Sequence, residues 1–199
     1  MQIDYKTQNT AQKYALMSQS IIPRPIAWIV TEDRDGVINI APFSYFTPLS
    51  SQPPTLIVSI GHKSDGTPKD TLRNIRETKK CTLCLVDEKN LKMMHLSSKA
   101  LAYKISEAEY FNIPVKKTLK EFPPMIEGIT SAFFCTLYRE VDLKKSKTIP
   151  LILEIKEQFI EDSRVDEKDN GVFVSFKPVG RIGKKYAFLG EEIEPPTIP

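Results

Sequence analysis

Residues 25–40 read PIAWIVTEDRDGVINI, a stretch with the pattern of a β-hairpin. The apolar run at residues 25–31 predicts one strand, and residues 37–40 predict the strand that returns beside it. Between them lies Asp33-Arg34-Asp35-Gly36, a polar turn that ends in glycine. Because a tight turn joins antiparallel strands, we expect the fold to begin with an antiparallel pair.

The rest of the chain continues this pattern of short apolar runs separated by turn residues. The runs add up to about seven strands, too many and too closely spaced for alternating βαβ units. The further strands are expected at residues 55–60, 81–86, 131–141, 151–160 and 171–176, and helices at residues 67–78, 88–96 and 106–109. We therefore predict a mainly β fold, an antiparallel barrel with a few helices packed outside it.

The helix at residues 67–78 has the clearest start signals. Thr67 is expected as its N-cap, with Pro68 at the first helical position. Asp70 follows Thr67 at the spacing of a capping box.

Composition limits the class of protein. A chain of 199 residues predicts a single domain, residues 1–199, and a net charge of +3 is too small to indicate a nucleic-acid partner. No apolar run reaches the ~18 residues of a membrane helix. Residues 1–6 are polar and do not resemble a signal peptide, and three cysteines, an odd number, fit free thiols in a reducing compartment. We expect a cytoplasmic protein without a membrane partner.

In residues 61–74, GHKSDGTPKDTLRN, a loop is followed by the start of a helix. This arrangement favours the binding of an anion. Helix N-termini offer unpaired N–H groups and partial positive charge. The side chains that would add charge or hydroxyl groups are Lys63, Ser64, Lys69 and Thr71. The spacing does not match a P-loop, so a nucleoside triphosphate is not indicated. The alternative is an ordinary capped surface helix with solvated lysines.

A second segment, Asn39-Ile40-Ala41-Pro42-Phe43-Ser44-Tyr45-Phe46, combines aromatic rings with amide and hydroxyl groups. A planar heterocycle needs flat apolar contact and a few hydrogen-bond partners, which such a segment can provide. The alternative is that its aromatic residues belong to the core.

Other polar residues give weaker signals. Cys81 and Cys84 form a C-x-x-C, but on a strand they face opposite sides with Cα atoms ~10 Å apart, too far for a disulfide or a shared metal. The only histidines are His62 and His95, which excludes a three-histidine metal site. We therefore predict no metal site and no side-chain acid or base for catalysis.

Several motifs in order resemble the flavin reductase-like, FMN-binding split-barrel family, which includes flavoredoxin. The resemblance covers about residues 20–187, nearly the whole chain, and leaves residues 188–199 as a tail or arm. The motifs are PRPIAW (23–28), N-x-APFS-x-F (39–46), PP (53–54), SIG (59–61), GTPKDT-x-x-N (66–74), the region 106–114, the strand 131–135 and the closing P-x-x-R-x-G-x-x-Y (178–186).

This resemblance implies a six-stranded Greek-key split β-barrel, FMN as cofactor and a homodimer with flavin sites near the subunit interface. It implies that Lys63, Ser64, Lys69 and Thr71 hold the FMN phosphate. The flavin ring and ribityl chain would be lined by Asn39, Ala41, Pro42, Phe43 and Ser44, with Thr31 and Phe46 nearby and Arg181 and Tyr186 closing the site. The chain departs from the family at Gln52, often Asp there, and at Gly183-Lys184, where the family often has two glycines.

The activity that the resemblance implies is hydride transfer from NADH or NADPH to the flavin, and then electron transfer to free flavin, iron or another acceptor. The alternatives are a non-catalytic electron-transfer protein serving a protein acceptor, as in flavoredoxin, and an FMN-binding module without turnover. The sequence has no G-x-G-x-x-G, so any nicotinamide site is not of the Rossmann type.

Overall fold

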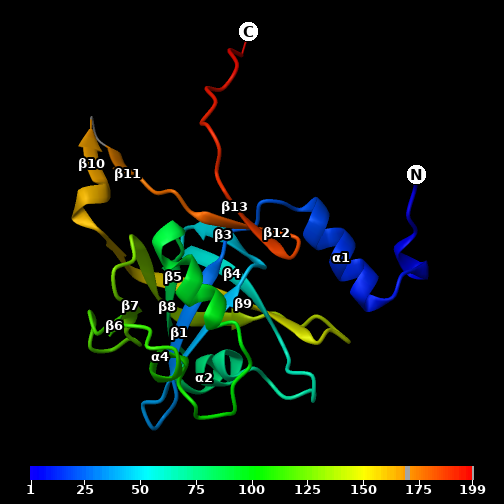
Figure 1. Ribbon diagram of the computed structural model, residues 1–199, viewed down its shortest axis with the longest axis horizontal. Coiled ribbons are helices and arrows are strands. Elements are labelled where there is room, and N and C mark those ends of the chain that lie inside the picture. Colours follow the sequence, from blue (N-terminus) through cyan, green and yellow to red (C-terminus); the bar gives the residue numbers. More distant parts are fainter. Residues whose placement is uncertain (169–170, 199) are drawn as a thin grey trace.

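The structure is a computed structural model that describes residues 1–168 and 171–198. It contains one large antiparallel sheet, three small two-stranded sheets and short helices around them (Figure 1). The mainly β class with a few peripheral helices is thereby confirmed. No helix in the described ranges is long and apolar enough to cross a bilayer.

The strands are β1 (Ala27–Glu32), β2 (Ile38–Phe43), β3 (Phe46–Ser51), β4 (Pro54–Gly61), β5 (Lys80–Leu85), β6 (Val115–Lys116), β7 (Met125–Ile126), β8 (Ser131–Glu140), β9 (Thr148–Ile160), β10 (Val165–Lys168), β11 (Gly171–Val174), β12 (Val179–Ile182) and β13 (Lys185–Phe188). The α-helices are α1 (Thr10–Ser20), α2 (Asp70–Thr78), α3 (Leu91–Leu96) and α4 (Glu107–Tyr110). Short 3-10 turns lie at Tyr5–Thr7, Glu88–Asn90 and Asp162–Arg164.

The large sheet has the strand order β2-β1-β5-β8-β9-β4-β3. Strand β1 pairs antiparallel with β2 on one side and with β5 on the other, so the predicted hairpin at residues 25–40 is confirmed. Its turn is fixed by Asp33, whose side chain accepts hydrogen bonds from the N–H groups of Asp35 and Val37. The sheet has seven strands where the resemblance implies six; one of them is the edge strand β3, for which the sequence analysis named no strand.

Apolar side chains are buried on both faces of β1. Trp28 and Val30 belong to one buried cluster, while Ala27 and Ile29 belong to the other. Successive residues of a strand point to opposite faces, so β1 separates two cores. This explains why residues 25–31 read as a continuous apolar run without polar alternation.

The cysteines follow the same alternation. Cys84 is buried in the cluster that contains Trp28, and Cys81 in the cluster on the opposite face. Their opposite orientation is the one expected for a C-x-x-C on a strand. Cys81 lies opposite Cys135 of β8, and all three thiols are free and buried.

The predicted N-cap of the helix at residues 67–78 is wrong by two residues. Helix α2 begins at Asp70 with Lys69 as N-cap, and the Lys69 side chain makes no capping hydrogen bond. Thr67 does not cap the helix, because its hydroxyl donates to Asp65 Oδ1 at 2.6 Å inside the preceding loop. The first turn of α2 is therefore left without a side-chain cap.

The longest elements that were not predicted are α1 and β3; the short strands β6, β7, β10, β12 and β13 were not predicted either. Helix α1 begins with a capping box in which Asn9 and Gln12 each bond the other's backbone N–H at 2.9 Å. Its residues are mostly exposed, so the segment lacks the apolar periodicity that marks a helix against a core. Strand β3 lies at the sheet edge with its residues mostly exposed, and it lacks alternation for the same reason.

Candidate functional site

A cleft of about 450 Å³ opens where the N-terminus of α2 meets β2, and we call it the helix-end cleft. Its walls include residues from β2, from the loop before α2 and from the segment that follows α3. Seven of the residues predicted to hold the cofactor line it, namely Asn39, Ala41, Pro42, Lys63, Ser64, Lys69 and Thr71. The two separate sequence segments are thus brought together at one site.

The first turn of α2 supplies the anion-binding groups of this cleft. The first N–H groups of a helix have no partner within the helix, and the N-cap Lys69 does not satisfy them. The Lys69 ammonium has no carboxylate within salt-bridge distance among residues 1–168 and 171–198. It lies 5.8 Å from the centroid of the Phe43 ring. An unpaired cation next to free N–H groups favours a phosphate or carboxylate.

Lys63 differs from Lys69, although the sequence gives the two equal weight. Lys63 Nζ lies 2.8 Å from Asp70 Oδ2, and Arg73 also pairs with Asp70, at 3.3 Å. Much of the positive charge of Lys63 is therefore balanced within the protein. The structure leaves Lys69 as the stronger attraction for an added anion.

A buried polar network supports the floor of the helix-end cleft. Asn39 Nδ2 donates to Thr71 Oγ1 at 2.9 Å, which joins β2 to the start of α2. Thr31 Oγ1 accepts from Asn74 Nδ2 at 3.1 Å and from Asn39 Nδ2 at 3.4 Å. Thr31 is fully buried and does not line the cleft, so the structure places it below Asn39 rather than at the surface.

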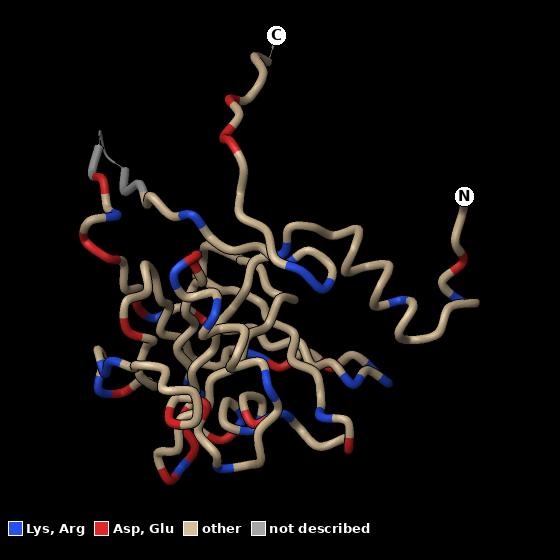
Figure 2. Tube along the Cα trace, in the orientation of Figure 1, with Lys and Arg blue, Asp and Glu red and all other residues tan. Residues whose placement is uncertain are grey.

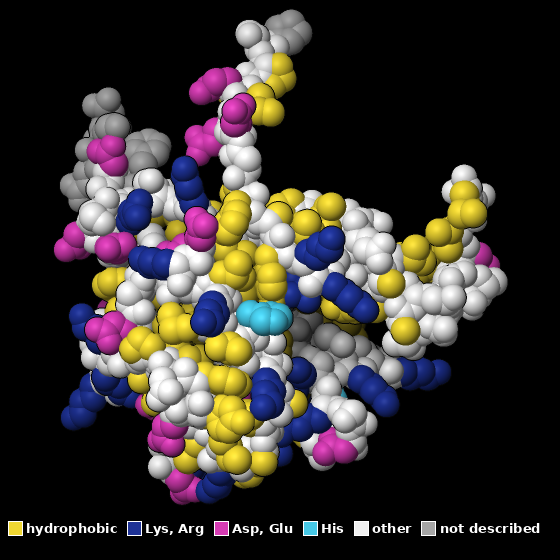
Figure 3. Space-filling model, viewed as in Figure 1, with side chains coloured by type: hydrophobic (Ala, Val, Ile, Leu, Met, Phe, Trp, Pro, Cys, Tyr) yellow, Lys and Arg dark blue, Asp and Glu magenta, His cyan; other side chains and the backbone are white. Residues whose placement is uncertain are grey.

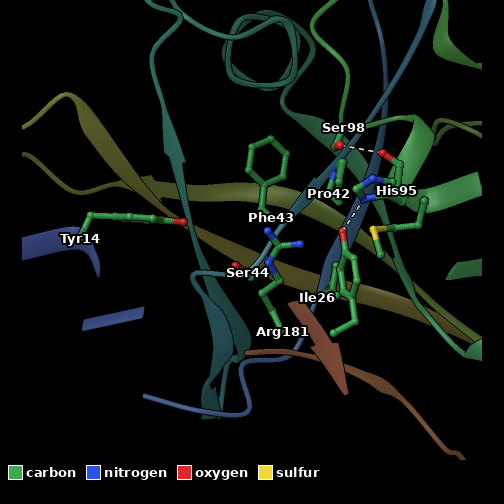
Figure 4. A pocket seen from close by; sticks show the side chains of 10 residues that line it. Tyr14, Ile26, Pro42, Phe43, Ser44, His95, Ser98 and Arg181 are labelled. Atoms are coloured by element: carbon green, nitrogen blue, oxygen red, sulfur yellow. Dashed lines mark hydrogen bonds between the residues drawn. The ribbon is translucent and has the colours of Figure 1, made fainter. Parts of the chain in front are cut away.

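A smaller cleft of about 210 Å³ adjoins the first and shares Pro42 and Ser98 with it. We call it the hairpin cleft, because β12 and β13 contribute Arg181 and Tyr186 to its wall. Figure 4 shows the side chains that line it, with Arg181 labelled. Phe43 and Ser44 line it as well. Every predicted site residue except Thr31 and Phe46 therefore lines one of two connected clefts.

The side chains of the hairpin cleft hold one another in place. His95 Nδ1 lies 2.9 Å from the Tyr186 hydroxyl, and the two rings meet edge to face. A dashed line at His95 marks this hydrogen bond in Figure 4. The Arg181 guanidinium lies 4.6 Å from the centroid of the Tyr186 ring, and its Nε donates to the Gly183 carbonyl at 3.2 Å. The cleft thus combines flat aromatic surface with a cation and hydrogen-bonding groups.

The β12–β13 hairpin reaches this position by packing on the segment before β1. The backbones of Arg24 and Arg181 exchange hydrogen bonds of 3.0 and 2.8 Å. A Cβ atom at Gly180 would lie 2.7 Å from Cβ of Pro23, so only glycine allows this approach. The two terminal motifs of the resemblance, at residues 23–28 and 178–186, therefore meet in space.

Phe46 is placed apart from both clefts. It lies at the start of β3, packs against the buried cluster of Leu72 and Ile75, and lines a different cavity beside α1. It shares that cavity with Ser44 but lines neither the helix-end cleft nor the hairpin cleft.

Comparison with known proteins identifies the family. A family model described as a flavin reductase like domain matches residues 17–173. This chain belongs to the flavin reductase-like family. Membership implies that the chain binds a flavin, in agreement with two connected clefts that offer anion-binding N–H groups and aromatic walls.

Solved structures agree with this flavin reductase-like assignment. The 2-nitrobenzoate 2-nitroreductase NbaA of Pseudomonas fluorescens is 29% identical with a TM-score of 0.88, covering 100% of this chain and 96% of its own. Nitrilotriacetate monooxygenase component B from Bacillus cereus is 27% identical with a TM-score of 0.89, at 98% coverage of both chains. A Shewanella frigidimarina protein with a split barrel domain, 19% identical, has a TM-score of 0.84 over 100% of both chains, which confirms the split-barrel fold.

Sequence reasoning missed Glu107, which lines the helix-end cleft of this flavin reductase-like chain. The residue is 6% exposed, and its Oε2 accepts the N–H of Ile40 at 2.9 Å. Burial raises the pKa of Glu107, and the negative charge of Asp70 adds to the rise. The sequence offered only an expected short helix at residues 106–109, which gives no sign that this carboxyl faces a cleft on β2.

The raised pKa of Glu107 predicts a pH-dependent contribution to stability. At pH values between the ordinary pKa of 4.5 and the raised pKa of the folded protein, Glu107 holds a proton in the folded chain that it has released in the unfolded chain. The free energy of unfolding therefore falls as pH rises through this window. Glu107→Gln lacks this titration, so its stability relative to the parent should improve as pH rises. Urea unfolding of both proteins at a series of pH values measures this difference, and a constant difference would contradict it.

Proposed function

We propose that the chain binds FMN across the helix-end and hairpin clefts and works as an NADH- or NADPH-dependent flavin oxidoreductase. The observation that carries the proposal is the uncapped first turn of α2 with Lys69 unpaired, directly beside the segment Asn39–Ser44. A ligand with a phosphate at one end and a planar ring at the other suits both clefts at once.

The residues of the chain have separate tasks in this proposal. The N-terminus of α2, Lys69 and Ser64 hold the phosphate, while Thr71 keeps Asn39 in position through their hydrogen bond. Pro42, Phe43 and Ser44 form the wall for the ring, which Arg181 and Tyr186 close from the other side. FMN, when bound, accepts a hydride and passes electrons on, so no side-chain acid or base is required.

The direct test is to load the purified protein with FMN and to follow NADH and NADPH oxidation with free flavin, ferric iron and a nitroarene as acceptors. The nitroarene is included because NbaA is named as a nitroreductase. We expect turnover with at least one donor and one acceptor. An FMN-loaded protein that oxidises neither donor would favour the alternative, an electron-transfer flavoprotein or FMN-binding module reduced by a protein partner.

We propose further that the protein is a cytoplasmic homodimer. Large apolar side chains stay exposed on α1, on the segment that follows it and on β3, including Tyr14, Ile21, Ile22 and Leu49, each about half exposed or more. A single chain leaves this face uncovered, and such patches mark interfaces. The free thiols fit a reducing compartment.

Sedimentation at micromolar concentration should therefore show twice the chain mass of 22.6 kDa. A stable monomer with FMN bound would contradict the dimer without affecting the assignment of the clefts.

A further inference from the structure

A third cavity, of about 450 Å³, lies between α1 and β3 and shares Ser44 with the hairpin cleft. We call it the Arg24 cleft. Most of its wall is apolar, from Met17, Ile21 and Phe46 together with prolines of the segment before β1. Apart from Ser44, none of its lining residues lines either cleft of the proposed flavin site.

Arg24 is the charged residue of this cavity, and it is only 5% exposed. Its Nη1 donates to the carbonyls of Ser18 and Ile21 at the end of α1, the second at 3.0 Å. Its Nε and Nη2 are buried and have no acceptor in the described part of the chain. The Tyr45 hydroxyl, also buried, lacks a partner as well, and its ring centroid lies 5.9 Å from the guanidinium.

A buried guanidinium with unmade hydrogen bonds is costly, because its charge has left water without gaining a counter-ion. A carboxylate is the group that best matches its planar set of donors. Because the wall around the Arg24 guanidinium is apolar, the ligand that carries the carboxylate should also present apolar groups to that wall. The cleft therefore suits a segment that alternates acidic and large aliphatic residues.

The C-terminal tail of this chain is such a segment. Residues 189–198 contain Glu191, Glu192 and Glu194 and no lysine or arginine. Ile193 is 91% exposed and Ile198 is 90% exposed. The tail stands away from the body of its own chain, with acidic positions along it and apolar side chains in solvent (Figures 2 and 3).

We propose that residues 189–198 of one copy of this chain dock in the Arg24 cleft of a second copy. A glutamate of the tail accepts hydrogen bonds from Nε and Nη2 of Arg24, and Ile193 packs against Met17 and Phe46. Such docking is compatible with the path of the tail, which extends away from the sheets and from α1 of its own chain (Figure 1). This single contact would give the buried Arg24 guanidinium a counter-ion and would also remove exposed aliphatic side chains of the tail from water.

Cross-linking tests this contact directly, because Cys81, Cys84 and Cys135 are buried and an added surface cysteine is the accessible thiol. Two differently tagged chains are co-expressed, one with Met17→Cys and the other with Ile193→Cys, and are treated with a short bismaleimide. We expect a covalent pair that carries both tags.

The matched control replaces Met17→Cys by Tyr138→Cys, on β8, where the side chain is 56% exposed. Equal yields in the two pairs would overturn the proposal. So would linkage that forms only within one chain when both substitutions are placed together, because the tail would then reach its own cleft.

The charge pairing is tested separately by changing Glu191, Glu192 and Glu194 together to Gln. The cross-link between the Met17→Cys and Ile193→Cys chains should fall about tenfold, since a desolvated charge pair is lost. The control changes three exposed glutamates elsewhere, Glu121, Glu127 and Glu157, and should leave the yield unchanged. An undiminished yield in the tail variant would refute the pairing with Arg24. Neither experiment depends on flavin, so its outcome is independent of the proposed activity.

Discussion

Riboflavin is expected to bind about a hundredfold or more weakly than FMN. The two ligands differ only in the phosphate, which in our proposal meets the uncapped N–H groups of α2 and the unpaired ammonium of Lys69. Each charge-assisted hydrogen bond contributes about 1.5–3 kcal/mol, so two such bonds already exceed the ~2.7 kcal/mol that a hundredfold difference requires. Titration of the apo-protein with each flavin, followed by fluorescence quenching, measures both dissociation constants.

The same titrations at raised ionic strength provide a control. Salt screens the attraction between phosphate and Lys69, so it should weaken FMN binding and leave riboflavin binding almost unaltered. Equal affinities for the two flavins at low salt would mean that the first turn of α2 does not hold the phosphate.

The sequence predicted the strands of the two-sided core well because their apolar runs are long and bounded by turns. Residues 25–31 and 55–60 overlap β1 and β4, which bury side chains against one or both cores. Residues 46–51 and α1 were missed for the opposite reason. Their surfaces are exposed in the single chain, so neither carries the apolar pattern that core packing imposes.

The candidate site likewise has some features that the sequence predicted and others that it could not show. The motifs at residues 39–42 and 63–71 lie at one place in the structure, since both segments line the helix-end cleft. The sequence could not show that Asp70 balances Lys63 and leaves Lys69 unpaired, because this depends on side-chain geometry at the start of α2. Glu107 was missed for another reason, namely that it reaches β2 from a distant helix.

The helix start was wrong because two local hydrogen-bonding patterns compete for the same residues. Thr67 precedes Asp70 at the spacing of a capping box. However, Asp65 lies two residues before Thr67, and its Oδ1 accepts hydrogen bonds from the hydroxyl and the N–H of Thr67. Short acidic side chains readily bond the backbone two residues ahead. This competition leaves the N-terminus of α2 uncapped, which is the feature on which the proposed phosphate site depends.

Lys69→Ala should raise the dissociation constant of FMN by about tenfold or more, the loss of about 1.4 kcal/mol or more of attraction. Lys69 precedes the first turn of α2 and has no carboxylate partner in the described ranges, so its removal breaks no ion pair of the protein. The rate at which NADH or NADPH reduces the flavin should stay within a few-fold of the parent at saturating FMN. The phosphate lies far along the ligand from the reactive ring, which accounts for this separation of binding from rate.

Lys120→Ala is the matched control, because Lys120 is exposed and lines neither cleft, and it should leave both quantities unchanged. Substitutions at Asn39 or Ser44 should have the opposite profile and alter the reduction rate, since these residues lie on the segment proposed to contact the ring. Stopped-flow reduction and FMN titration of the three kinds of variant separate the two effects. A Lys69→Ala protein that kept its affinity, or that lost reduction while fully loaded, would require the phosphate to be placed elsewhere.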